Sequence, residues 1–292
     1  MRERLHVAPA LERLGYADAA TRLRTVRADA LAHVEAARYR EAWTGTLWWL
    51  REPRGRRSYR VLSEAELLAT RRSDTAFVFG SGGSLRQIAP DEWERIGRHD
   101  TVGFSHFHRQ RWVDVSYHLV AEVNGVEETA ASIRTNPRYS NTVFLVGKGW
   151  MAQAPNELVA RRLLPQGARI FRWRRVARGL TVPPSPSLRR GFVHGSNSSL
   201  DVVNFALVMG WKRVVVVGVD LYDRSYFFLD EGETRPDERE GWHASMPFHQ
   251  ADHVVSMFGL WRRHAEARGV ELSVYSPRSL LAQVLPVFTW DG

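Results

Sequence analysis

The chain has 292 residues, of which 44% are hydrophobic and 25% charged, an ordinary composition for a globular protein. It contains 41 Lys and Arg against 32 Asp and Glu, a formal net charge of +9, and nearly all of the cations are arginine. This excess fits anionic partners such as nucleotides, acidic or phosphorylated glycans, nucleic acid or an acidic membrane surface, and it also fits an arginine-rich genome composition. The absence of cysteine excludes disulfides and thiolate zinc sites.

No stretch approaches the roughly 20 apolar residues that a membrane-spanning helix needs. Residues 1–6, Met-Arg-Glu-Arg-Leu-His, lack the apolar core of a secretory signal. We therefore expect a cytoplasmic protein that makes at most peripheral contact with the acidic inner face of the membrane.

Residues 1–70 are predicted to form a helical N-terminal appendage. Residues 8–43 carry apolar positions at helical spacing, which predicts a pair of amphipathic helices. Residues 51–60 are predicted as a basic loop, and Ser63-x-x-Glu66 predicts a capping box. The basic and aromatic residues of this part indicate packing on the main domain, with nucleic-acid binding as the alternative.

Residues 71–292 alternate strands with helices. This order predicts an α/β fold: a doubly wound, mostly parallel, Rossmann-like sheet with helices on both faces. Strands are expected at 76–79, 100–104, 117–121, 142–146, 169–173, 214–219 and 271–275. An amphipathic helix is expected at 253–268 and a final helix at 278–284, and the acidic, aperiodic residues 229–247 are expected to form a lid.

Polar residues follow several of these strands or precede a helix. They are Gly80, Ser81, Gly82, Gly83, Ser84, Ser105, Asn197, Ser198, Ser199 and Asp220. Glycines directly after a strand let the backbone approach a ligand closely. Asn197 and the serines precede a wholly apolar helix that ends at Gly210. Ligands bind at the carboxyl ends of parallel strands and anions bind at helix N-termini, so we expect a nucleotide or phosphate site here.

Several short segments, in this order, resemble one known family. They are Gly80-Ser-Gly-Gly-Ser-Leu85, Ser198 with Gly210-Trp-Lys212, Gly218-Val-Asp-Leu-Tyr222, Tyr226-Phe227, Phe248-His-Gln-Ala-Asp252 and Pro277-Arg-Ser-Leu-Leu-Ala282. From Phe77 to about Leu285 the chain resembles the bacterial sialyltransferases of glycosyltransferase family 42. The resemblance implies an inverting glycosyltransferase that moves sialic acid or a related acidic sugar from a CMP-activated donor to a glycan hydroxyl. The resemblance further implies that the enzyme requires no metal and no cofactor.

The resemblance also implies roles for individual residues. His249 would be the general base that takes the proton of the acceptor hydroxyl, which suits an imidazole with a pKa near neutrality. Tyr222 and Tyr226 would donate hydrogen bonds to the phosphate of the departing nucleotide. Ser198 would hold the donor, and Asp220 would orient its loop or bind a ribose hydroxyl. His243 and His253 are rivals for the base.

The expected partners are the nucleotide-sugar donor and a glycan or lipid-linked glycan acceptor, without nucleic acid. A homo-oligomer is compatible with the sequence. Ser81 and Ser105 stand where the family has asparagines that touch the cytidine nucleotide, which leaves the donor base open.

Two alternatives remain open. The glycine turn also resembles archaeal-type 6-hydroxymethylpterin diphosphokinases, which need magnesium-binding carboxylates near that turn. Asp91 and Glu92 are the nearby acids, and they are interpreted as helix-start residues. The other alternative is a catalytically inactive nucleotide-binding or assembly protein of the same fold.

Overall fold

The computed structural model describes residues 44, 46–120, 125–149, 152–178, 182–194, 197–222, 225–230, 233 and 247–290. The predicted helix pair at 8–43, most of the predicted lid and His243 lie outside these residues. The side chain of His249 also lies outside the described part, although its backbone belongs to a helix.

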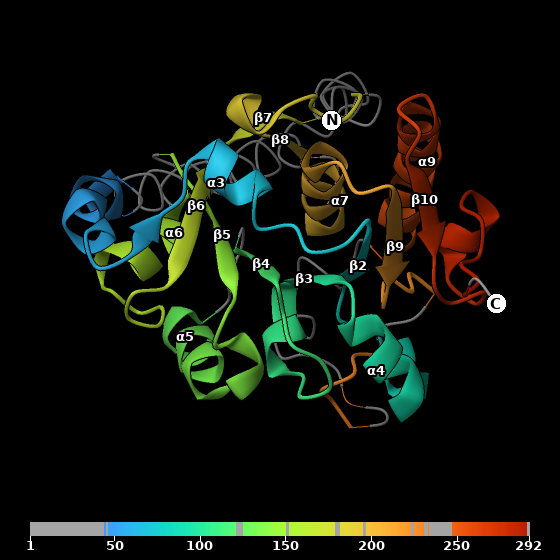
Figure 1. The fold of residues 1–292 in the computed structure, drawn as a ribbon, viewed down its shortest axis with the longest axis horizontal. Coiled ribbons are helices and arrows are strands. Elements are labelled where there is room, and N and C mark those ends of the chain that lie inside the picture. Colours follow the sequence, from blue (N-terminus) through green and yellow to red (C-terminus); the bar gives the residue numbers. More distant parts are fainter. Residues whose placement is uncertain are drawn as a thin grey trace, which may run out of the picture.

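An eight-stranded sheet forms the centre of the described chain (Figure 1). Its order is β1-β6-β5-β4-β3-β2-β9-β10, and every neighbouring pair runs parallel. The strands are β1 (Arg60–Val61), β2 (Thr75–Phe79), β3 (Asp100–Phe104), β4 (Tyr117–Val120), β5 (Val143–Gly147), β6 (Arg169–Trp173), β9 (Arg213–Val217) and β10 (Glu271–Val274). A separate parallel pair consists of β7 (Arg175–Arg178) and β8 (Phe192–His194). The predicted parallel architecture is confirmed.

Helices pack on both faces of the sheet. They are α3 (Glu64–Leu68), α4 (Pro90–Gly97), α5 (Val126–Thr135), α6 (Gln153–Ala160), α7 (Ser198–Met209) and α9 (Pro247–Glu266). Side chains of a strand point alternately to its two faces, so Ala76 and Val78 join the core beneath α7 and α9, whereas Phe77 and Phe79 join the core beneath α4, α5 and α6. Helices on both faces of a parallel sheet confirm the Rossmann-like prediction.

The residues before β2 contain more regular structure than the sequence indicated. The predicted basic loop is wrong in its first part. Residues 46–56 are helical, and a turn at residues 57–58 follows them. Glu52 and Arg56, one helical turn apart, form an ion pair of 3.7 Å between Oε1 and Nε. The capping box is confirmed: the Glu66 backbone N–H donates to Ser63 Oγ (3.2 Å), and the Ser63 N–H donates to Glu66 Oε2 (2.8 Å).

Helix α7 forms as predicted from its apolar sequence. Asn197 is its N-cap, and Gly210 ends it in the left-handed region at φ 77°. All of its residues except Ser198 and Val208 are buried. Directly after the helix, Trp211 Nε1 donates to Asp100 Oδ2 (2.9 Å). Because Asp100 begins β3, α7 ends at the amino edge of the sheet, and its N-terminus therefore lies at the carboxyl edge.

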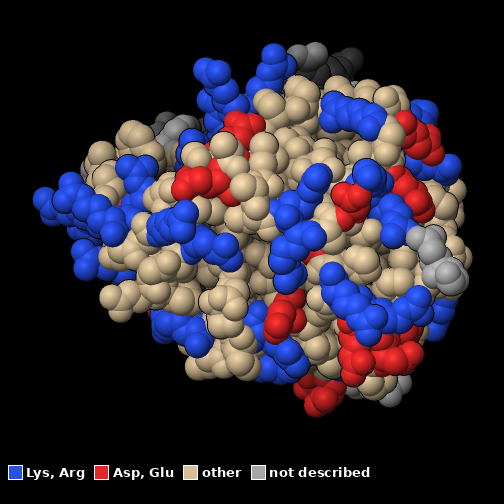
Figure 2. Space-filling view, viewed as in Figure 1, with Lys and Arg blue, Asp and Glu red and all other residues tan. Residues whose placement is uncertain are grey.

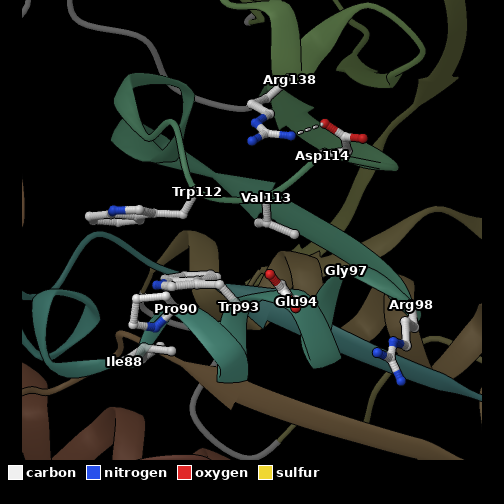
Figure 3. Close-up of a pocket in the computed structure, with 10 residues that line it drawn as sticks. All are labelled: Ile88, Pro90, Trp93, Glu94, Gly97, Arg98, Trp112, Val113, Asp114 and Arg138. Carbon is white, nitrogen blue, oxygen red and sulfur yellow. Dashed lines mark hydrogen bonds and ion pairs between the residues drawn. The ribbon is translucent and has the colours of Figure 1, made fainter.

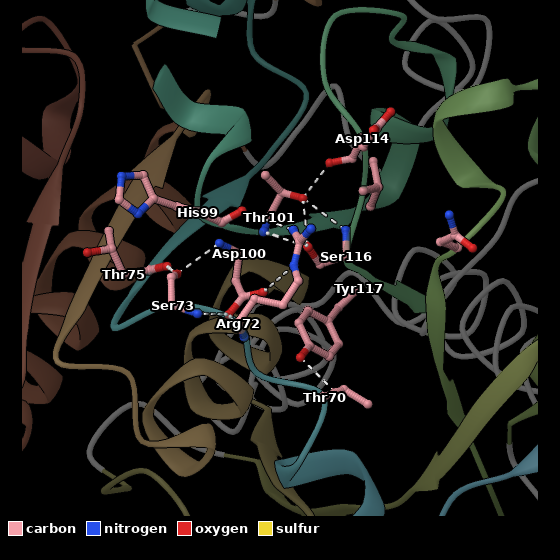
Figure 4. Close-up of polar contacts among 12 residues, drawn as sticks. Thr70, Arg72, Ser73, Thr75, His99, Asp100, Thr101, Asp114, Ser116 and Tyr117 are labelled. Carbon is pink, nitrogen blue, oxygen red and sulfur yellow. Dashed lines mark hydrogen bonds and ion pairs between the residues drawn. The ribbon is translucent and has the colours of Figure 1, made fainter. Parts of the chain in front are cut away.

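A polar network closes the amino edge around the fully buried carboxylate of Asp100 (Figure 4). The backbone N–H groups of Arg72 and Ser73 donate to its Oδ2 at 2.9 and 3.2 Å, and Arg72 Nε lies 3.3 Å from its Oδ1. A buried carboxylate needs several donors, and here they come from the segment that enters β2. The network thus fixes that entry and plays a structural role.

Candidate functional site at the carboxyl edge of the sheet

The strand order reverses between β2 and β9. From β2 the chain moves to β3 through α4 on one face, whereas β9 is reached through α7 on the opposite face and is followed by β10. In open α/β sheets the crevice at such a switch point is where ligands bind. The segments that follow these two strands are the predicted glycine turn and the segment that contains Asp220.

Hydrogen bonds between main chains hold these two segments together. Gly82 N–H donates to the Gly218 carbonyl (2.8 Å), and Gly83 N–H donates to the Ser225 carbonyl (3.0 Å). A Cβ atom on Gly82 would lie 2.3 Å from Asp220 Oδ2. The turn therefore uses glycine for close packing against the loop after β9, in addition to any approach of a ligand.

Asp220 fixes the end of the turn. Its carboxylate accepts the Ser84 backbone N–H at Oδ2 (3.0 Å) and the Ser84 hydroxyl at Oδ1 (2.6 Å), and both residues are buried. Of the two roles expected for Asp220, these contacts correspond to orienting the loop.

Ser81 and Ser105 lie at the junction between the turn and the 3₁₀ helix η3 (Ser105–Arg109). Buried Ser81 accepts the His106 backbone N–H at its Oγ (3.2 Å). Ser105 is exposed and has φ 53°, and Leu221 after β9 has φ 66°. Left-handed backbone at residues other than glycine costs free energy and is often found at functional sites. Two such residues lie at this edge.

The segment 226–228 packs beside the turn. Tyr226 forms a bridge with Gly82, and the Phe227 N–H donates to the Ser81 carbonyl (3.1 Å). The Phe227 ring is buried against Trp112, with centroids 5.3 Å apart, whereas Tyr226 is half-buried. Tyr226 thus lies at the glycine turn, whereas its neighbour Phe227 packs in the apolar core.

Tyr222 is also half-buried and lies beside a cation, Arg278, that was not among the predicted site residues. The Arg278 guanidinium is 5.5 Å from the centroid of the Tyr222 ring. The next residues hold the loop after β9: Ser279 Oγ donates to the Val219 carbonyl (2.7 Å), and the Leu280 N–H donates to the Asp220 carbonyl (3.1 Å). The only sequence signal for Arg278 was its place within the segment 277–282.

The start of α7 shares this edge. Asn197 Oδ1 accepts the Ser199 backbone N–H (3.1 Å) and the Ser199 hydroxyl, so Asn197 caps the helix. Ser199 is buried, and Ser198 is partly exposed. The described hydrogen bonds link the glycine turn to η3 and to the loop after β9. Asn197, Ser198 and Ser199 lie at the same carboxyl edge, at the start of α7.

His249 belongs to the first turn of α9. This helix of 20 residues is about 30 Å long, whereas a five-residue strand is about 17 Å long. Because α9 ends next to β10 at the amino edge, its first turns extend beyond the carboxyl edge. The backbone of His249 therefore lies at the same edge as the glycine turn, on the α7 face. Its rival His253 is exposed one turn later.

Two histidines, His108 of η3 and His118 of β4, are buried with ring centroids 6.2 Å apart. Burial lowers the pKa of His108 to about 2 and that of His118 to about 3, and repulsion from neighbouring histidines adds to this effect. His108 Nδ1 is 2.9 Å from Ser132 Oγ, and His118 Nδ1 is 3.0 Å from the Tyr139 hydroxyl. Both imidazoles are therefore neutral core groups at physiological pH.

Asp91 and Glu92 lie in the first turn of α4, which confirms that they are helix-start residues. Glu92 accepts the Ala89 N–H at Oε2 (3.0 Å) and the Tyr275 hydroxyl at Oε1. Within the described ranges, no group of three or more His, Asp or Glu side chains is arranged to hold a metal. None of the described helices is long and apolar enough to cross a membrane.

A cavity of about 660 Å³ lies between α4 and residues 112–114 (Figure 3). Trp93 and Trp112 stack in its wall, with centroids 5.0 Å apart, and Arg138 pairs with Asp114 at 3.1 Å. Of the predicted site residues with described side chains, none lines this cavity.

Comparison with solved structures finds similar folds among sialyltransferases. CstII from Campylobacter jejuni in complex with the substrate analogue CMP-3FNeuAc matches with a TM-score of 0.45 and 14% identity, over 73% of this chain and 85% of that chain. CstII in complex with a trisaccharide acceptor and CMP matches with a TM-score of 0.44 and 12% identity, over the same shares of the two chains. The monofunctional alpha-2,3-sialyltransferase Cst-I from Campylobacter jejuni matches with 0.44 and 11%, over 78% of this chain and 82% of that chain.

The sequence itself matches no protein-family model, and it matches none of the curated proteins.

Proposed function

We propose that the chain is an inverting glycosyltransferase that moves an acidic sugar from a CMP-activated donor to a glycan hydroxyl. One observation carries the proposal: the motif residues after β2 and β9, which are far apart in sequence, are bonded to each other at the switch point of a doubly wound sheet. This crevice is the position at which such a fold binds a nucleotide.

In the proposed reaction the acceptor oxygen attacks the anomeric carbon while His249 takes the hydroxyl proton. The bond from the anomeric carbon to the phosphate oxygen breaks, and CMP leaves with the electron pair of that bond. The Tyr222 and Tyr226 hydroxyls donate to the phosphate as its charge grows, and the guanidinium of Arg278 adds positive charge beside Tyr222. A single displacement inverts the anomeric configuration. The position of the first turn of α9 at the carboxyl edge supports His249 as the base.

The first test is a thermal-shift panel of CMP, UDP, GDP and ATP, with and without magnesium, because a ligand stabilises only a folded state that it binds. Selective stabilisation by CMP is the expected result. Stabilisation by ATP with magnesium alone would contradict the proposal in favour of a diphosphokinase.

The second test uses His249→Ala, with His253→Ala as the matched control on the same helix. His249→Ala is expected to lower transfer from CMP-sialic acid by roughly 10²–10⁴-fold, the usual contribution of a general base, and to leave CMP binding intact. His253→Ala is expected to keep its activity. Binding of CMP without turnover in the wild type would indicate an inactive binding protein instead.

A further inference from the structure

A second cavity, of about 600 Å³, opens at the carboxyl edge beyond the switch point. Its walls come from the carboxyl ends of β1 and β6 and the residues that follow them, from the residues after β5, from the 3₁₀ helix η5 (Leu188–Arg190) and from the helical residues 46–56. Lys and Arg side chains gather over this end of the molecule in Figure 2, where the helical residues 46–56 lie in Figure 1. None of the transferase-site residues whose side chains the structure describes lines this cavity.

The charges of the lining are strongly unbalanced. Among the residues that the structure describes, five cations line the cavity: Arg56, Lys148, Arg172, Arg174 and Arg189. The two acids of the lining are Glu52 and Glu64. A concave surface of one predominant charge, partly walled by apolar rings, concentrates ligands of the opposite charge. Phe171 and Trp173 supply such buried rings in the wall.

Arg172 is the buried centre of this set, with only 8% of its surface exposed. Its Nη2 donates to Asn156 Oδ1 (2.7 Å), and Asn156 also holds the Gly149 carbonyl through Nδ2 (2.7 Å). Its Nε lies 3.8 Å from Glu52 Oε1, the same oxygen that faces Arg56. Nη1 is buried without a hydrogen-bond partner among the described residues. One shared carboxylate thus faces two guanidinium groups, which leaves this buried charge incompletely compensated.

We propose that this cavity binds an acidic group, a carboxylate or a phosphate, of the saccharide acceptor. The inference rests on the proposed transferase function, and it adds the substrate class: an anionic oligosaccharide. The switch-point strand β2 is separated from β5 and β6 by three and four strand spacings in the sheet order, or about 14–19 Å. An extended oligosaccharide is the kind of acceptor that reaches from the reacting hydroxyl to an anion at that distance.

The test measures binding by calorimetry with the full chain. Tetragalacturonate is the anionic probe, maltotetraose is the neutral probe of equal length, and inorganic phosphate is the small anion. The variant Lys148→Ala with Arg189→Ala removes two exposed cations of the lining. The matched control, Arg263→Ala with Arg268→Ala, removes two exposed cations from the end of α9 and its following turn.

Wild type is expected to bind tetragalacturonate at least about tenfold more tightly than maltotetraose. The lining variant is expected to lose about tenfold in that affinity, and the control variant is expected to keep it. Saturating CMP is expected to leave tetragalacturonate binding in place. Equal affinity for both tetrasaccharides, an unchanged lining variant, or displacement by CMP would each overturn the inference. Binding of phosphate without tetragalacturonate, lost in the lining variant, would support the anion site and assign it to a phosphate group instead of a carboxylate.

CMP titrations separate this inference from the proposed function. All three proteins are expected to bind CMP equally. If none binds CMP but tetragalacturonate binding still depends on the lining cations, the anionic saccharide site stands and the transferase assignment falls.

Arg172→Lys gives a further check, because lysine keeps the charge but loses the fixed geometry of the guanidinium. A weaker affinity for tetragalacturonate is expected, and an unchanged affinity would contradict the central role of Arg172.

Discussion

Asp220 accepts both the backbone N–H and the hydroxyl of Ser84, so one buried carboxylate ties the loop after β9 to the turn after β2. The two segments that form the candidate nucleotide site are therefore positioned by each other. A change in either segment is therefore expected to displace the other.

Asp220→Asn is expected to lower the free energy of unfolding by about 2 kcal/mol, since hydrogen bonds to charged groups contribute about 1.5–3 kcal/mol. Ser84→Ala is expected to cost about 1–2 kcal/mol for the same reason. Urea denaturation of both single variants and the double variant measures their coupling. The double variant should lose at least about 1 kcal/mol less than the sum. Strict additivity would show that the two side chains do not act together.

Gly82→Ala is expected to destabilise the protein by about 1–3 kcal/mol and to weaken CMP binding, because the new Cβ would lie 2.3 Å from Asp220 Oδ2. Gly97→Ala is the control, since its Cβ would meet only Val113 Cγ2 at 3.5 Å. At this helical position alanine should be neutral or stabilising by up to about 1 kcal/mol. Equal melting temperatures for the two variants would contradict the close packing of the turn.

The backbone of Ser105 gives a prediction at a single position. Ser105→Gly relieves a left-handed conformation and should raise stability by up to about 1 kcal/mol, whereas Ser105→Val should lower it by about 1–2 kcal/mol. The side chain is exposed, so lost packing cannot explain such a difference. Thermal unfolding measures both variants, and a valine variant as stable as the glycine variant would argue against backbone strain.

The buried histidines predict a loss of stability in acid. Burial lowers the pKa of His108 to about 2 and that of His118 to about 3, so below pH 6.5 the unfolded chain binds two protons that the folded chain does not. Above pH 6.5 the two neutral histidines do not reduce the free energy of unfolding. As the pH falls well below 6.5, the free energy of unfolding decreases by up to about 2.7 kcal/mol per pH unit, until the pH approaches the folded-state pKa values.

His118→Gln removes one of these groups and should reduce that slope by about half, or about 1.4 kcal/mol per pH unit. Urea titrations at several pH values from 7 to 4.5 measure the slope. An unchanged slope in the variant would mean that His118 does not set the acid sensitivity.

Tyr222→Phe tests the proposed stabilisation of the leaving group. Loss of one preorganised donor should lower kcat for transfer by roughly 10–10³-fold, with little change in stability. Tyr275→Phe is the control, because that hydroxyl donates to Glu92 and has no proposed contact with the nucleotide. A kcat unchanged in Tyr222→Phe would remove this tyrosine from the mechanism.

Much of the fold was predictable because its main elements carry strong local patterns. The valine run of β9, the apolar α7 between Asn197 and Gly210, and the Ser63 capping box each encode their structure within a few residues. Strand β1, only two residues long, could not be predicted, since its pairing with β6 depends on a partner more than 100 residues away.

The predicted final helix shows another limit of local patterns, because it is the short 3₁₀ helix η6 (Leu280–Gln283) instead of a full helix over 278–284. Within the site, the sequence indicated which residues follow the strands. It could not indicate that the Ser84 hydroxyl is directed to Asp220, or that Arg278 lies over Tyr222, because those contacts arise from folding.

The pairing of β2 with β9 has a consequence for synthesis on the ribosome. Thr75 pairs with Arg213, which is translated 138 residues later, whereas β3 to β6 are all available before that point. One edge of β2 therefore remains open on the nascent chain, and a stalled or truncated product would present that edge to other chains. Chaperone demand should accordingly be greatest just before residues 213–217 leave the exit tunnel.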